Sequence, residues 1–196
     1  RSDTVMQRPA DGYSLYYAVR SIMGITPHVY PKSKLDPVKD FTPLTMVSTS
    51  PSMLVAHPKL PVKNVAELIA LAKAKPGQLN FAIGAMGSSL HMAGDAFKMK
   101  SGVYIVNIPY RGTAPAVQDV LAGQVELMFA AIGNVQSHIK AGKLKAIGIT
   151  ASVRSALVPE IPSLSEAGVK DLNLEIWNAV AAPNSMPKPV VMRLSA

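Results

Sequence analysis

Between residues 65 and 150, short apolar segments alternate with longer segments whose apolar residues recur at helical spacing. The expected strands are 79–83, 103–108, 125–129 and 144–150. The expected helices are 65–75, a segment carrying Leu90, Ala93 and Phe97, one beginning near residue 113, and 134–141. Because strands that alternate with helices form parallel sheets covered on both faces, this pattern predicts an α/β domain.

The helix at 65–75 has clear boundary signals. Asn64 is a favourable N-cap, and Glu67 three residues later completes a capping box. Pro76 and Gly77 then end the helix.

The segments on either side of this region are less regular. Strands are expected at 13–18, 43–55 and 174–181, with a proline-rich loop at 26–42. A short helix is expected after Ser163, with Glu166 in the capping-box position, and a last helix begins near Lys188. We therefore expect a middle lobe, 57–150, and an outer lobe formed by 1–56 and 151–196, which is discontinuous and incomplete in this chain.

Composition argues against several functional classes. The chain has no cysteine, which removes disulfides, thiolate nucleophiles and thiolate metal sites. The net charge is +8, but the basic residues are scattered and aromatic residues make up only 6%, so small anions are expected as ligands rather than nucleic acid. The four histidines show no metal-ligand spacing, and neither a metal nor a cofactor is expected.

The sequence also lacks the usual signatures of catalysis. It has no nucleophile elbow, no P-loop and no dinucleotide fingerprint. The acidic residues Asp95, Asp119 and Glu126 are expected to be solvated. No catalytic residue is assigned, and the chain is not expected to be an enzyme.

The most informative stretch is 84–91, which follows an expected strand and opens an expected helix. A helix N-terminus in this position presents free backbone N–H groups at the carboxyl edge of the sheet, where a carboxylate or phosphate can bind. Candidate ligand-binding residues are Gly84, Gly87, Ser88, Ser89 and His91. Taken alone, the stretch also fits an ordinary turn with a serine N-cap, and His91 fits a structural role.

A second stretch, 109–115, has the same strand–turn–helix arrangement. Arg111 can hold a carboxylate through two hydrogen bonds, or pair with an acid at the surface. Tyr110 either lines a pocket or packs, and Thr113 is expected to cap the following helix. With Gly112, these residues form a second candidate anion site at the same sheet edge.

Several strings in the chain resemble one protein family. They are residues 11–13, 30–41, 60–68, 74–80, 109–115 and 141–144. The family is the TctC/Bug group, the extracytoplasmic solute receptors of tripartite tricarboxylate transporters. The resemblance extends along nearly the whole chain.

The resemblance implies a periplasmic binding protein of class II type, with two α/β lobes that close on a small organic carboxylate. It implies periplasmic localisation, delivery of the ligand to membrane permease subunits, and no chemistry on the ligand. By the same resemblance, the segment 19–26 contributes from the outer lobe, with Ser21 as its candidate ligand residue. The residues themselves leave two alternatives open: the effector domain of a transcriptional regulator, and a small α/β enzyme acting on organic acids.

The chain departs from the family pattern in two respects. A first strand–helix unit and a C-terminal portion are missing, so an exposed edge of the outer lobe is expected to favour a homodimer. Val19, Ile22, Met23 and Ala130 stand where relatives often carry polar or acidic residues. These four apolar residues predict that the ligand is an aromatic or longer-chain carboxylate rather than citrate.

Overall fold

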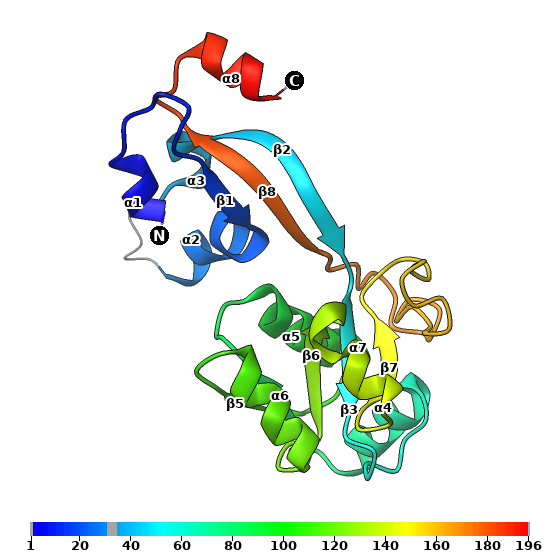
Figure 1. Ribbon diagram of the computed structural model, residues 1–196. Helices are drawn as coiled ribbons and strands as arrows, with labels where there is room; N and C mark the ends of the chain where they lie inside the picture. The colour runs from blue at the N-terminus through cyan, green and yellow to red at the C-terminus, as the bar shows by residue number, and fades with distance from the viewer. Residues whose placement is uncertain (1, 31–34, 196) are drawn as a thin grey trace. The chain divides into compact units, whose positions relative to one another are not determined.

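The computed structural model describes residues 2–30 and 35–195, and it divides into two compact units (Figure 1). Unit 1 comprises residues up to Thr49 and from Ile176 onward, and unit 2 is Ser50–Glu175. These boundaries differ from those expected at 56/57 and 150/151. The segment 52–56 belongs to the sheet of unit 2, and the chain after residue 150 continues to pack on that unit.

Unit 2 is built on a five-stranded sheet with the order β5-β4-β6-β3-β7. The strands are β3 (Ser52–Ala56), β4 (Asn80–Ile83), β5 (Val106–Pro109), β6 (Leu127–Ala131) and β7 (Lys145–Ile149). The parallel arrangement predicted from the sequence is confirmed for β4, β5 and β6. β3, which comes from the segment expected to form a strand of the outer lobe, lies between β6 and β7 and runs antiparallel to both.

The position of β3 follows from a break in the segment expected as one strand, 43–55. That segment is two strands, β2 (Phe41–Ser50) in unit 1 and β3 in unit 2, with Pro51 between them. Proline has no backbone N–H and cannot continue a ladder of hydrogen bonds. The chain therefore passes from one sheet to the other at this residue.

Helices cover both faces of the unit 2 sheet: α4 (Val65–Ala74) and α5 (Ser89–Ser101) on one, α6 (Thr113–Ala122) and α7 (Ile132–Lys140) on the other (Figure 1). Successive side chains of a strand point to opposite faces. In β3, Leu54 and Ala56 accordingly join the core under α4 and α5, whereas Met53 and Val55 join the core under α6 and α7.

The boundary signals of α4 are confirmed. The Asn64 side chain accepts the Glu67 N–H at 2.9 Å, and Glu67 in turn accepts the Lys63 N–H at 2.8 Å. The helix ends at Ala74, before Pro76 and Gly77.

The helix expected after Ser163 is wrong. Ser163 and Glu166 do exchange the two hydrogen bonds of a capping box, at 3.0 and 3.2 Å. The residues that follow form turns, however, and Gly168 reverses the chain with a φ of +95°. The capping contacts form, but too few residues separate them from Gly168 for a helix.

Unit 1 contains a three-stranded sheet with the order β1-β8-β2. β1 (Tyr16–Val19) pairs antiparallel with β8 (Ile176–Pro183). The Tyr16 and Phe41 rings stack with centroids 4.7 Å apart in its small core. The helices of the unit are α1 (Ser2–Met6), a π-helix (Ser21–Ile25), α2 (Thr26–Val29), α3 (Pro37–Asp40) and α8 (Lys188–Ser195).

Two of these helices lie within the segment expected to be a loop. α2 and α3 are both four residues long and both contain proline in the first turn, where its missing N–H costs no hydrogen bond. Residues 31–34, part of the same expected loop and of the family-like string 30–41, lie outside the described residues.

Candidate functional site

The two turns singled out in the sequence lie against each other at one edge of the unit 2 sheet. β4 and β5 are parallel neighbours, so the turns that follow them emerge side by side. The Gly84 carbonyl accepts the Gly112 N–H at 2.8 Å, and the Ile83 carbonyl accepts the Tyr110 N–H at the same distance. A Cβ on Gly84 would lie 2.9 Å from the Thr113 Cα, which explains why glycine occupies this position.

The first turn leads directly into α5. Ser88 is the N-cap, and its Oγ accepts the His91 N–H at 3.2 Å. Gly87 is buried with a φ of +73°, and its N–H donates to Nδ1 of His91 at 3.1 Å. The Gly87 amide, expected to be free for a ligand, thus already has an acceptor within the protein.

Other donors of this turn remain available. The Ser88 Oγ accepts the His91 N–H through a lone pair, so the Ser88 hydroxyl proton can still be donated to a ligand. The Ser89 side chain forms no hydrogen bond among the described residues. The N–H groups of Ser89 and Leu90, in the first turn of α5, have no acceptor within the helix.

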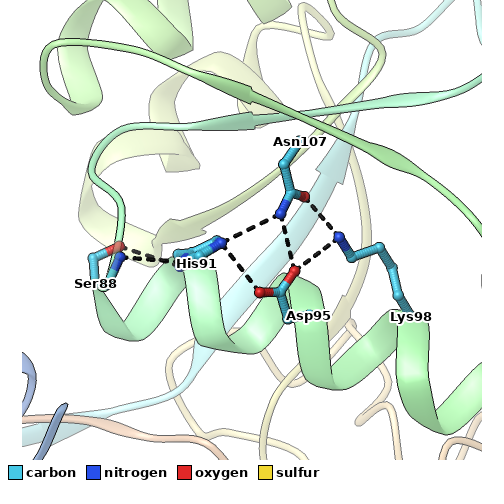
Figure 2. A network of polar contacts seen from close by, with 6 residues as sticks. Ser88, His91, Asp95, Lys98 and Asn107 are labelled. Atoms are coloured by element: carbon cyan, nitrogen blue, oxygen red, sulfur yellow. Dashed lines mark hydrogen bonds and ion pairs between the residues drawn. The ribbon is translucent and has the colours of Figure 1, made fainter. Parts of the chain in front are cut away.

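His91 lies at the centre of a polar network on α5 (Figure 2). Its side chain is 9% exposed, and Nε2 lies 3.1 Å from Oδ2 of Asp95. Asp95 also contacts Nζ of Lys98 at 2.8 Å and accepts from Nδ2 of Asn107 at 3.0 Å. Burial of the Asp95 carboxyl acts to raise its pKa, but the hydrogen bonds from Lys98 and Asn107 and the neighbouring positive charge prevail, and the pKa lies below its usual value.

The second turn is fixed through Tyr110. Its hydroxyl donates to Oδ2 of Asp119 on α6 at 2.7 Å. Burial, together with this hydrogen bond to a carboxylate, raises the pKa of Tyr110 to about 12. The phenol is therefore directed to α6.

Arg111 and Thr113 complete this turn. The Arg111 side chain is exposed, and it forms no hydrogen bond or ion pair among the described residues. Thr113 was expected to cap α6, but the N-cap is Gly112, with a φ of +126°, and Thr113 is the first residue of the helix. The helix has no side-chain cap, so its first amides remain open to an outside acceptor.

The three acidic residues expected to be solvated are each partly exposed, and each also has partners within the protein. Asp95 and Asp119 accept the bonds described above. Glu126 accepts both the backbone and the side-chain N–H groups of Asn80, at 2.9 and 3.1 Å. His91 and Lys98 lie one turn from Asp95 on α5, a spacing visible in the sequence, whereas Asn107 and Asn80 reach Asp95 and Glu126 from other parts of the chain.

A groove of about 360 Å³ lies between α6 and α7. It is lined by Thr113, Ala114, Val117, Gln118, Asn134 and His138. Asn134 and His138 were not singled out from the sequence. Their i,i+4 spacing places them one turn apart on α7, and this is the signal that could have found them.

The remaining candidates divide between the units. Ser21 opens the π-helix of unit 1, where its carbonyl accepts the Thr26 hydroxyl at 3.1 Å. Ile22 and Met23 pack against the core of that unit. Ala130 is fully buried under α6 and α7 and does not form an open ligand surface. It therefore does not support the prediction of an aromatic or longer-chain carboxylate, which used Ala130 as a pocket residue.

The described residues contain no group of three or more histidine, cysteine or acidic side chains able to hold a metal ion. No helix among them is long and apolar enough to cross a membrane.

Comparison with known proteins gives a consistent result. The family model for the tripartite tricarboxylate transporter family receptor (TctC) matches residues 2–196. Protein BugT of Bordetella pertussis is 33% identical over 195 residues, which cover 99% of this chain and 60% of BugT. The chain spans about 58–60% of the length of the first curated relatives it matches.

Solved structures agree. R. palustris Rpa4515, solved with adipate, superimposes with a TM-score of 0.91 at 32% identity, covering 98% of this chain and 64% of that one. MatC from Rhodopseudomonas palustris, with bound malate, gives 0.85 at 30% identity, covering 97% and 65%. The periplasmic binding-protein fold implied by the resemblance is thereby confirmed, and the chain belongs to the tripartite tricarboxylate transporter receptor family.

Proposed function

We propose that this chain is the ligand-binding part of a periplasmic receptor that captures a small organic dicarboxylate for membrane permease subunits. The observation that carries the proposal is the meeting of two strand–helix turns at Gly84 and Thr113. Together they present the open N-termini of α5 and α6 at one sheet edge, where the helix dipoles favour an anion.

The donors left uncommitted at this edge fit a carboxylate. The hydroxyls of Ser88, Ser89 and Thr113 can donate, and so can the first amides of α5 and α6. Arg111, exposed and without a partner among the described residues, supplies a planar pair of N–H donors that matches a carboxylate.

Two further observations support an anionic ligand. The net charge of +8 draws small anions toward the protein. The relatives Rpa4515 and MatC were solved with the dicarboxylates adipate and malate. Tyr110 and Gly112 shape the turn, and Ser21 of unit 1 is proposed as a contributor outside unit 2.

Titration calorimetry of the chain with adipate, malate, citrate and benzoate tests the proposal. We expect binding of at least one dicarboxylate, and Ser88→Ala should weaken it by about 0.5–1.5 kcal/mol, the usual net contribution of one hydrogen bond. Arg111→Ala should weaken binding more, because a charged donor pair contributes about 1.5–3 kcal/mol.

Arg193→Ala is the matched control, since Arg193 is also an exposed arginine but lies on α8 of unit 1. It lowers the net charge equally and should leave affinity nearly unchanged. If no carboxylate binds, or if the two arginine variants lose the same affinity, the proposed site is wrong.

A further inference from the structure

We propose that His91 positions the anion-binding turn and does not contact the ligand: its Nδ1 holds the Gly87 amide, and the Asp95–Asn107–Lys98 cluster maintains the tautomer that makes this possible. The inference rests on the proposed carboxylate function of the turn. Figure 2 shows the network, with His91, Asp95 and Lys98 on α5 and Asn107 reaching it from β5.

The tautomer of His91 follows from its neighbours. A backbone N–H can only donate, so the 3.1 Å contact from Gly87 requires an unprotonated Nδ1. A neutral imidazole carries its proton on the other nitrogen, and Nε2 lies 3.1 Å from the Asp95 carboxylate, which accepts it. Each ring nitrogen is thus occupied, and a largely buried ring has no free atom for a ligand.

The orientation of Asn107 is determined in the same way. The Lys98 ammonium can only donate, so the Asn107 atom 2.8 Å from it is the carbonyl Oδ1. Nδ2 of Asn107 then donates to Oδ1 of Asp95 at 3.0 Å. The 3.3 Å contact between Nδ2 of Asn107 and Nε2 of His91 joins two donors and is not a hydrogen bond.

Asp95 is therefore held as an acceptor for three donors from His91, Asn107 and Lys98. Its pKa lies below the usual value, so it remains a carboxylate at neutral pH and continues to accept the Nε2 proton. By accepting the Nε2 proton, Asp95 fixes the tautomer of His91 and also the orientation of its ring.

The consequence for the turn is a two-point attachment to His91. The His91 backbone N–H bonds Ser88 Oγ, and the His91 ring bonds the Gly87 N–H. Gly87 has a φ of +73°, so this residue reverses the chain just before the helix. With its amide committed, the amides of Ser89 and Leu90 are left to face an anion.

Protonation of His91 removes this attachment, because an Nδ1–H would face the Gly87 N–H at 3.1 Å and both groups donate. Among the described residues, the charged groups bonded within the network are Asp95 and Lys98 on α5, and β5 contributes the neutral Asn107. A doubly protonated His91 ring could therefore not hold the turn in this way.

Two variants separate the functions of the ring nitrogens. In His91→Asn, the side-chain carbonyl reaches roughly the position of Nδ1 and can still accept the Gly87 N–H. In His91→Gln, the side-chain amide reaches roughly the position of Nε2 and keeps the bond to Asp95 but provides no acceptor for Gly87. We expect His91→Asn to bind adipate within about threefold of the unchanged chain, and His91→Gln to bind about tenfold more weakly.

The difference between the two variants provides the readout that a merely structural role would not change. A general loss of packing at His91 would weaken adipate binding in both variants, whereas loss of the bond to the Gly87 N–H weakens it only in His91→Gln. Equal losses in the two variants would overturn the proposal.

A measurement without ligand distinguishes this inference from the proposed function. Amide hydrogen exchange followed by NMR should show the Gly87 N–H protected in the unchanged chain and in His91→Asn, and exposed in His91→Gln. If no carboxylate binds, the proposed function fails, and this exchange pattern still decides whether His91 holds the turn. An unprotected Gly87 amide in the unchanged chain would refute it directly.

Discussion

Replacement of Gly84 by alanine tests the packing of the two turns against each other. The backbone of Gly84 is not in the left-handed region, so alanine adds only a steric demand. Its Cβ would lie 2.9 Å from the Thr113 Cα and 3.0 Å from the Thr113 N. Both are backbone atoms at the start of α6, so no flexible side chain can move aside.

The cost combines two effects. Overpacking in a well-packed site costs about 1–3 kcal/mol. Separating the turns also stretches the 2.8 Å bond from the Gly112 N–H to the Gly84 carbonyl, which contributes about 1 kcal/mol. We expect the free energy of unfolding to fall by about 3 kcal/mol, which corresponds to a Tm lower by roughly 6–12 °C for a chain of this size.

Urea unfolding followed by far-UV circular dichroism measures this change, and Gly94→Ala is the matched control. Gly94 lies within α5, and a Cβ there would meet ring atoms of Phe129 and Phe81 at 3.8 and 4.0 Å, which are ordinary contacts. Alanine in a helix should raise stability by about 0.5–1 kcal/mol. If Gly84→Ala is as stable as the unchanged chain, the turns are not packed as described.

Three further substitutions test separate features. The pKa of Tyr110 is raised to about 12, so the stabilisation by its protonated hydroxyl is fully present below the ordinary pKa of 10 and is lost as pH rises through about 12. Tyr110→Phe should therefore remove one late step from the alkaline absorbance titration of the six tyrosines. Ser52 is fully buried and its hydroxyl has no partner among the described residues, so Ser52→Ala should raise the free energy of urea unfolding by about 1 kcal/mol, and a loss of stability would reveal a missed partner. Asn64→Ala removes the N-cap of α4 and should lower stability by about 1 kcal/mol, while an unchanged midpoint would mean that the cap contributes nothing.

The sequence alone was sufficient for features that depend on neighbouring residues. The alternation of strands and helices, the cap at Asn64 and the turns that begin at Gly84 and Tyr110 all follow from propensities and spacings within a few residues. Periodicity and capping act over one or two turns, so they are visible in any window of the chain. The family-like strings 60–68 and 109–115 include the Asn64 cap and the turn at Tyr110, and the resemblance implied the same fold.

Tertiary structure decided which residues meet across the sheet. The antiparallel insertion of β3, the reach of Asn107 from β5 to α5, and the groove between α6 and α7 depend on strand order and register. Strand order brings together residues that are far apart in sequence, and no local pattern encodes it. For the same reason the sequence left open whether His91 contacts a ligand or has a structural role, whereas the folded chain gives both of its ring nitrogens partners.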